Sequence, residues 1–267
     1  MENGSSNSWQ ELLKFPLPGR SKKPRRDGLT MVIDKGIGLN ETRDLLDMAS
    51  PYIDMIKLGF GTPALYNQTI LREKIRLVTS HGIDIFPGGT FLEVAIMQGK
   101  MQDFIQTACD FGFTAVEVSD GTIDLSDRLR EQAVEMAAGL GLKVLTEVGK
   151  KEPGNALCFK DLIRLARKDL NNGACWVIVE GRDPGKDVGL YDDKGRLIEK
   201  ELLELLSTLE DPSLLIWEAP DKEQQQDLIL RLGVNVNIGN VSPREVIALE
   251  ALRVGLRADT LMTVYEP

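Results

Sequence analysis

Short runs of apolar residues recur along most of the chain, and the stretches between them carry apolar residues three or four positions apart. Eight such runs are rich in β-branched or large apolar residues, and they occupy residues 29–34, 54–59, 83–89, 114–120, 143–149, 175–181, 213–219 and 234–239. Runs of this length that are bounded by polar residues and glycine predict buried β-strands.

The stretches between the runs predict α-helices. Segments such as REKIRLVTSHG, MQDFIQTACDFG, LREQAVEMAAGLG and KDLIRLARKDLNNG place apolar residues on one helical face and end with glycine. Eight strands that are apolar along their length and alternate with helices are typical of a parallel sheet covered by helices. We therefore predict an α/β protein, a single-domain (β/α)8 TIM barrel over residues 28–267. A doubly wound open sheet is the alternative.

Residues 1–27 precede the first predicted strand and are mostly polar. They include the basic run SKKPRR at residues 21–26. A basic run outside the core is most often a solvated tail, although it can also be a targeting motif. We expect these residues to form a short N-terminal arm outside the core.

The strands of the predicted barrel carry polar residues near their carboxyl ends. Successive side chains of a strand point to opposite faces, so Val116 and Val118 share one face while Glu117 lies on the other. If the apolar faces contact the helices, the polar residues point into the barrel. Either Asp34 or Lys35 is expected to join a ring that consists of Lys57, Glu117, Glu147, Glu180, Glu218 and Asn237.

Composition narrows the kinds of ligand and location to be considered. The chain of 267 residues has a formal net charge of −9, which disfavours general binding to nucleic acid. No apolar run reaches the ~18 residues that a membrane span requires, and the first residues lack a secretory pattern. The three cysteines match no zinc motif and are expected to be buried free thiols in a reducing cytoplasm, and His81 is expected to end a helix. We expect a cytoplasmic protein with a small-molecule substrate and no nucleic-acid or membrane partner.

A ring of mixed charges at the carboxyl end of a barrel predicts a ligand site. Buried charges are costly without partners, and active sites of such barrels lie at this end. Carboxylate oxygens suit Mg²⁺, whereas lysine and arginine suit phosphate and other oxyanions. A desolvated lysine has a lowered pKa and can exchange a proton near neutral pH. The residues thus indicate Mg²⁺-assisted chemistry on a small polyanion, without identifying it.

Eight motifs, taken together and in order, resemble the phosphosulfolactate synthase family. They are IDKG (33–36), IKLGFGT (56–62), FPGGTFLE (86–93), VEVSDGT (116–122), LTEVGKK (145–151), IVEGRDPGKDVGLYD (178–192), WEAP (217–220) and NVNIGNV (235–241). The resemblance implies a (β/α)8 barrel that adds sulfite to phosphoenolpyruvate with Mg²⁺ and gives (2R)-phospho-3-sulfolactate, at the head of coenzyme M synthesis. It also implies a homo-oligomer.

The resemblance and the strand ends together suggest a role for each candidate residue. In the family the second lysine of GKK, here Lys151, is the proposed acid, and Glu147 is expected to bind the metal or to tune that lysine. The candidate metal ligands are Glu117, Glu180 and Glu218. The residues expected to bind substrate are Lys35, Lys57, Arg182, Asn237, Gly239 and Asn240, the last three because barrels commonly bind phosphate after the eighth strand.

Two alternatives stay open. A barrel lyase could act on another phosphorylated small acid, because the fold alone does not specify the substrate. A relative could instead have lost catalysis and serve in binding or stress tolerance. The GKK lysine and the strand-end carboxylates favour an enzyme. The long segment 181–200 is expected to form a lid or a subunit contact.

Overall fold

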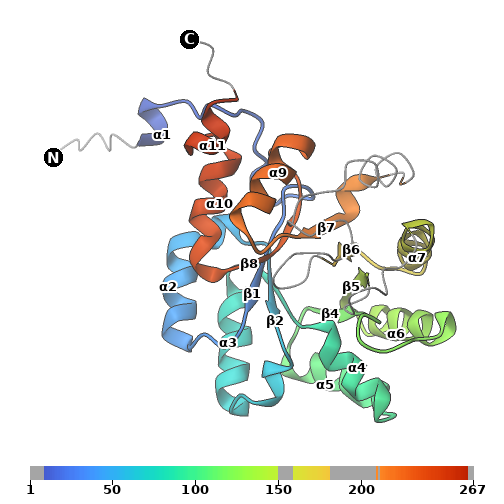
Figure 1. The fold of residues 1–267 in the computed structure, drawn as a ribbon. Helices are drawn as coiled ribbons and strands as arrows, with labels where there is room; N and C mark the ends of the chain where they lie inside the picture. Colours follow the sequence, from blue (N-terminus) through green and yellow to red (C-terminus); the bar gives the residue numbers. More distant parts are fainter. Residues whose placement is uncertain (1–8, 150–158, 181–208, 210, 264–267) are drawn as a thin grey trace.

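The computed structural model describes residues 9–149, 159–180, 209 and 211–263, which form one barrel surrounded by helices (Figure 1). The strands are β1 (Thr30–Asp34), β2 (Met55–Leu58), β3 (Asp84–Pro87), β4 (Ala115–Val118), β5 (Lys143–Val148), β6 (Trp176–Val179), β7 (Leu215–Glu218) and β8 (Ile238–Val241). Seven neighbouring pairs are parallel, in the order β3-β2-β1-β8-β7-β6-β5-β4.

The two ends of this sheet meet between β3 and β4. The backbone N–H of Thr114, just before β4, donates to the carbonyl of Ile85 in β3 over 3.1 Å. The Thr114 hydroxyl accepts a hydrogen bond from the Ile85 N–H over 3.0 Å. These contacts bring the edge strands together into a nearly closed barrel. The predicted (β/α)8 barrel is confirmed, and the open sheet is wrong.

The helices lie outside the barrel and follow the strands in the predicted alternation (Figure 1). The longer ones are α2 (Leu39–Ala49), α3 (Gln68–Ser80), α4 (Gly89–Met97), α5 (Met101–Phe111), α6 (Asp127–Gly139), α7 (Phe159–Asn171), α9 (Lys222–Leu232) and α10 (Val246–Arg253). Side-chain caps from Asn67 and Ser126 begin α3 and α6, and His81 ends α3 as predicted. Two helices, α4 and α5, follow β3 where the pattern predicted one.

Alternation of side chains divides the buried residues into two groups. Outward-facing strand residues pack against the helices in the larger apolar core, which includes Val116, Val118, Val177 and Trp217. Inward-facing residues fill the barrel below the charged ring, and these are Leu29, Met31, Met55, Phe86, Ala115, Leu145, Ile178 and Ile216. Strands buried on both faces explain the near-continuous apolar runs in the sequence. The charged ring therefore lies directly on an apolar layer.

The described part of the N-terminal arm contacts the amino-terminal end of the barrel. The short helix α1 (Trp9–Leu12) is followed by a segment in which Arg20 pairs with Glu250 over 2.9 Å and Arg25 pairs with Asp54 over 2.8 Å. Both arginine side chains are largely buried. The basic run is therefore not fully solvated, because its Arg25 is paired with Asp54, just before β2, and the preceding Arg20 is paired with Glu250 of α10.

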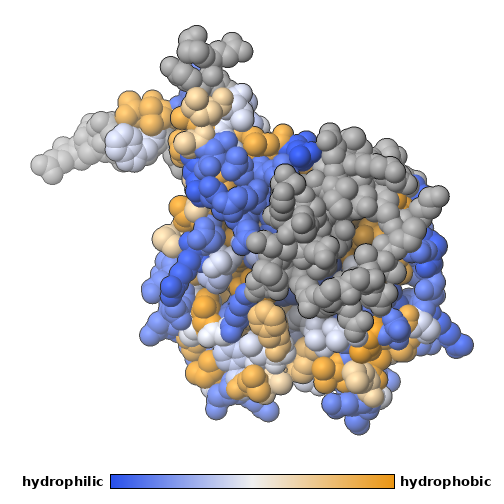
Figure 2. All heavy atoms as spheres, viewed as in Figure 1, coloured by the Kyte–Doolittle hydropathy of each residue, from blue (hydrophilic) through white to orange (hydrophobic). Residues whose placement is uncertain are grey.

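Among the described residues, no helix combines the length and apolar composition that crossing a lipid bilayer requires. Cys109 and Cys175 are free thiols as predicted, but they are half-buried instead of buried, and Cys158 lies outside the described residues. Hydrophilic and hydrophobic residues are interspersed over the face in Figure 2.

Candidate active site

A pocket of about 320 Å³ opens at the carboxyl ends of the strands. Lys57 of β2, Glu117 of β4, Glu147 of β5, Glu218 of β7 and Glu180, the residue after β6, all line it. Each occupies the inward-facing position one step above the apolar layer, as strand alternation requires. The predicted convergence is confirmed for these five residues, whereas their chemical roles stay predictions.

Lys57 lies at the centre of this group. Its Nζ is 2.9 Å from Glu117 Oε2, 3.1 Å from Glu218 Oε1 and 3.5 Å from Glu147 Oε2. Burial by itself would lower the pKa of Lys57, but the attraction of Glu117, Glu218 and Glu147 outweighs it and raises the pKa well above its ordinary value. Lys57 therefore stays protonated, and the lowered pKa expected of a desolvated lysine does not apply to it.

Glu117 is held from two sides. Besides the contact with Lys57, its Oε1 accepts a hydrogen bond from the backbone N–H of Gly89, the first residue of α4, over 2.8 Å. A Cβ atom on Gly89 would lie 2.8 Å from Glu117 Oε1 and 2.6 Å from Ser119 Oγ, so only glycine fits there. The carboxylate at a helix N-terminus is also favoured by the helix dipole.

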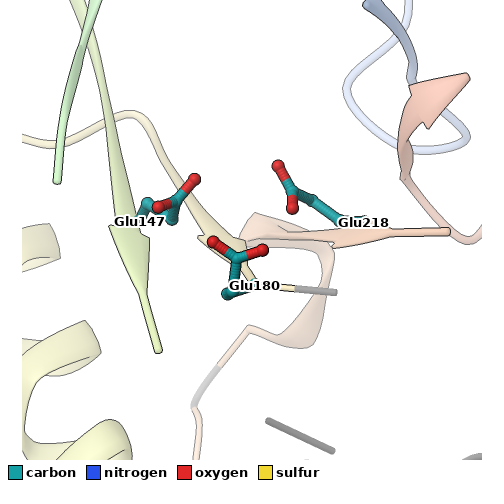
Figure 3. Close-up of side chains that lie close together, drawn as sticks. All are labelled: Glu147, Glu180 and Glu218. Atoms are coloured by element: carbon teal, nitrogen blue, oxygen red, sulfur yellow. The ribbon is translucent and has the colours of Figure 1, made fainter. Parts of the chain in front are cut away.

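Three carboxylates form a group that could hold a metal ion. One oxygen from each of Glu147, Glu180 and Glu218 lies within 4.8 Å of the others, and the three residues are buried. Figure 3 shows these side chains converging from β5, from the end of β6 and from β7. The metal ligands predicted from the sequence are Glu117, Glu180 and Glu218. The structure groups Glu147 with those two residues and places Glu117 on Lys57 and Gly89.

The donor set fits a hard divalent cation. Among the described residues that line the pocket, four carboxylates face one ammonium group, which leaves an excess of negative charge. Buried carboxylates that lie this close repel one another unless a cation compensates them. Oxygen ligands from carboxylates are those that Mg²⁺ accepts, and it typically keeps waters or substrate oxygens as well.

Glycine residues allow the strand ends to approach one another. Gly149, after β5, has φ +127°, and a Cβ there would lie 2.6 Å from Glu180 Cβ. Gly239 in β8 faces the barrel interior, where a Cβ would lie 2.6 Å from Met31 Cε. Glycine therefore allows close approach to Glu180 at position 149 and close packing inside the apolar layer at position 239.

Of the residues expected to bind substrate, Asn240 lies at the edge of the pocket, and Lys35 lies beside Phe60, one of its lining residues. Asn240 lines it and adopts a left-handed backbone with φ +55°, a conformation uncommon outside glycine. Lys35 is exposed, and its Nζ lies 5.4 Å from the centre of the Phe60 ring. Lys35 and Asn240 also line an adjoining pocket of about 570 Å³. These positions do not test whether Lys35 or Asn240 binds substrate.

Asn237 is not part of this group. Its Oδ1 accepts from the Leu29 N–H over 2.9 Å, and its Nδ2 donates to the carbonyls of Ser213 and Leu215. These partners lie where β1 and β7 begin, at the opposite end of the barrel. The prediction failed because β8 begins at Ile238, so Asn237 precedes the strand instead of closing it.

The alternative that Asp34 joins the ring is also wrong. Asp34 Oδ1 accepts backbone hydrogen bonds from Gly36 and Ile37, and its other oxygen pairs with Lys74 of α3. Lys74 also donates to the carbonyl of Ile37. Asp34 thus faces the helices and stabilises the turn after β1.

Several predicted features fall outside the described residues. Lys151 and Arg182 are among them, and so is the long segment 181–200. Their proposed roles stay predictions from the sequence.

Two buried polar residues on the helices were not predicted from the sequence. Glu93 of α4 accepts hydrogen bonds from Ser119 Oγ and from the backbone N–H groups of Thr122 and Ile123 in the loop after β4. Arg130 of α6 is buried and bonds to the carbonyl of Glu147. Arg130 lies in the same helical stripe as Ala133, Val134 and Ala137. A charged residue on an apolar stripe is the signal that could have identified it.

Comparisons with known proteins identify the family of the chain. A profile of the (2R)-phospho-3-sulfolactate synthase (ComA) family matches residues 18–259. Phosphosulfolactate synthase from Methanothermobacter thermautotrophicus is 42% identical over 249 residues, covering 92% of this chain and 96% of the relative. The enzyme of that name from Methanocaldococcus jannaschii is 44% identical over 235 residues, covering 87% and 93%. The one from Bacillus subtilis is 35% identical over 246 residues, covering 91% and 96%.

Solved structures show the fold at lower identity. 3-Hexulose-6-phosphate synthase from Salmonella typhimurium superposes with a TM-score of 0.57 at 16% identity, over 89% of this chain and 100% of that one. This likeness concerns the barrel alone. The family match, by contrast, spans most of the chain with high identity to three curated relatives. The chain therefore belongs to the phosphosulfolactate synthase family of enzymes, lyases that form a carbon–sulfur bond.

Proposed function

We propose that the chain catalyses the Mg²⁺-dependent addition of sulfite to phosphoenolpyruvate, which gives (2R)-phospho-3-sulfolactate. Family membership supports the reaction type. The observation that supports the metal is the group formed by Glu147, Glu180 and Glu218, whose oxygens lie within 4.8 Å of one another in a pocket beside one buried cation. Both substrates are anions, so a carboxylate-lined pocket requires additional positive charge to bind them.

The proposed reaction balances as an addition followed by a proton transfer. The sulfur lone pair of sulfite forms a bond to the methylene carbon, and the π electrons move toward the substrate carboxylate. A proton then reaches the carbon that bears the phosphate. Bound Mg²⁺ would supply electrostatic stabilisation of the negative charge that develops on the substrate carboxylate.

Metal binding, positioning and proton transfer are proposed for different residues of the chain. Glu147, Glu180 and Glu218 would hold the cation. Lys57 fixes Glu117, Glu147 and Glu218 through its three contacts, and its raised pKa makes it a poor proton donor. The proton is therefore assigned to another group. We propose Lys151, on the strength of the GKK motif, with Glu147 contributing to the metal site.

Binding of the anionic groups is assigned to four of the residues that the sequence predicts to bind substrate. Lys35, Arg182, Gly239 and Asn240 are proposed to bind the phosphate, carboxylate or sulfite. We further propose a cytoplasmic homo-oligomer, which light scattering coupled to size-exclusion chromatography would test for subunit number. Coenzyme M or another sulfolactate route is proposed as the destination of the product.

Phosphorus NMR of phosphoenolpyruvate tests the reaction. We expect the substrate signal to be replaced by a product signal only when sulfite and Mg²⁺ are both present, and chelation of the metal to stop the conversion. Conversion with another nucleophile in place of sulfite would favour a different lyase. An unchanged signal with folded protein would favour a non-catalytic relative and would remove the proposal.

A further inference from the structure

Arg130 of α6 joins four parts of the molecule through one buried guanidinium. Its side chain is 3% exposed. Nε and Nη2 form a two-pronged contact with Asp169 of α7, the shortest distance being 2.7 Å, and Nη1 donates to Asp120 over 3.1 Å in the loop after β4. Nη2 also donates to the main-chain carbonyl of Glu147 over 2.8 Å. The guanidinium of Arg130 is thus bonded to the carboxyl end of β5, the strand that carries Glu147.

The carboxyl end of β5 has a second attachment. The carbonyl of Val148 accepts a hydrogen bond from the Glu180 N–H over 3.1 Å, and Gly149 lies against the Glu180 side chain. A displacement at Glu147 therefore shifts Glu180 as well. Carboxylate oxygens that share a cation must be placed accurately. A small movement of the backbone at the carboxyl end of β5 therefore changes the geometry in which Glu147, Glu180 and Glu218 can bind the cation.

We propose that Arg130 is a positioning residue for the metal-binding carboxylates, which acts by fixing the backbone of Glu147 relative to Glu180. This positioning role rests on the proposed function in one respect, namely that Glu147, Glu180 and Glu218 together bind a divalent cation. Arg130 does not line the pocket, so it acts through Glu147. The planar guanidinium can bind Asp169, Asp120 and the Glu147 carbonyl together, whereas a lysine ammonium cannot reproduce this geometry.

Arg253 of α10 provides a matched control. It is also fully buried, and it donates to the main-chain carbonyls of Val234 and Val236 over 2.6 and 2.7 Å and to that of Leu29 over 3.3 Å. These carbonyls lie near the amino ends of β1 and β8, at the other end of the barrel from the pocket. Arg253→Lys therefore disturbs a comparable buried arginine without touching the strand ends that carry the carboxylates.

The test compares Arg130→Lys, Arg253→Lys and the wild type in full-length protein. Mn²⁺ affinity is measured by electron paramagnetic resonance, together with Tm, kcat and KM. We expect Arg130→Lys to weaken Mn²⁺ binding and to lower kcat by about 10-fold or more, as loss of groups that orient metal ligands generally does. Arg253→Lys is expected to lower Tm but to leave Mn²⁺ affinity and kcat unchanged.

The outcomes separate this proposal from the proposed function. Equal effects of the two substitutions on Mn²⁺ affinity would overturn the positioning role, and so would a wild type that binds no Mn²⁺. If Arg130→Lys does not fold, Asp120→Asn removes one partner of the guanidinium and should weaken Mn²⁺ binding in the same direction; unchanged binding would overturn the proposal. Wild type that binds Mn²⁺ but does not turn over phosphoenolpyruvate would remove the proposed function alone.

Discussion

Replacing Lys57 with methionine removes the ammonium group that lies between three buried carboxylates. The Nζ distances to Glu117, Glu218 and Glu147 are 2.9, 3.1 and 3.5 Å, and the lysine side chain is 8% exposed. Removing one partner of a buried ion pair typically costs about 3–5 kcal/mol, because the remaining charge is left uncompensated. In a chain of this size we expect Tm without divalent cations to fall by roughly 6–20 °C.

Thermal unfolding with and without Mg²⁺ measures this effect. Mg²⁺ should raise the Tm of Lys57→Met more than that of the wild type, because the carboxylates in the variant have lost their internal cation and bind an external one more tightly. Lys74→Met is the control, since Lys74 is equally buried but pairs with Asp34, outside the pocket. It should lower Tm without an enhanced response to Mg²⁺.

The pH dependence of the same variant gives an independent check. The folded-state pKa of Lys57 lies above its value in the unfolded chain, so its stabilising contribution is complete below about pH 10.4 and is lost as pH rises through the folded-state pKa. The Tm difference between wild type and Lys57→Met should hold between about pH 8 and pH 10 and narrow above that range. An unchanged Tm in the variant, or an equal response of both lysine variants to Mg²⁺, would refute the reasoning.

Three other substitutions, two of them with a matched control, give further predictions. Glu180→Gln should abolish product formation by phosphorus NMR, because the proposed metal site loses one of its three carboxylates; conversion at the wild-type rate would contradict this. Gly149→Ala should lower the free energy of unfolding in urea by about 1–3 kcal/mol and reduce turnover, since the backbone has φ +127° and a Cβ would contact Glu180. Gly99→Ala, with φ +67° and open space around it, should cost less and leave turnover intact. Lys151→Ala should reduce kcat far more than Lys150→Ala, and equal reductions would remove the assignment of the acid.

The fold was predictable because the strands are apolar on both faces and alternate regularly with helices. The same alternation placed Glu117, Glu180 and Glu218 inside the barrel, since each follows an outward-facing valine or tryptophan of its strand. The inward orientation of Glu147 was harder to predict from the sequence, because the apolar Leu145 lies on the same face of the strand. The structure explains this, since Leu145 belongs to the apolar layer directly beneath the carboxylate.

The predictions from the sequence failed where the local pattern of apolar and polar residues does not determine where a strand begins or which side chains a residue contacts. Asn237 was misplaced because the run 234–239 does not reveal that β8 begins only at Ile238. Asp34 was undecided because its partner, Lys74, is 40 residues away and lies on a helix. The position of Arg130 on an apolar stripe was visible, but its contact with the Glu147 carbonyl depends on how α6 packs against β5. Such contacts between distant elements require the folded structure.

In the proposed function Glu147, Glu180 and Glu218 bind one divalent cation at the mouth of the barrel. Anomalous diffraction from crystals grown with Mn²⁺ tests it most directly, with crystals of Glu218→Gln as the control. We predict a single strong peak bounded by these three carboxylates, and its loss or marked weakening in the variant. A peak at another position, or no peak in a crystal that contains Mn²⁺, would contradict the account.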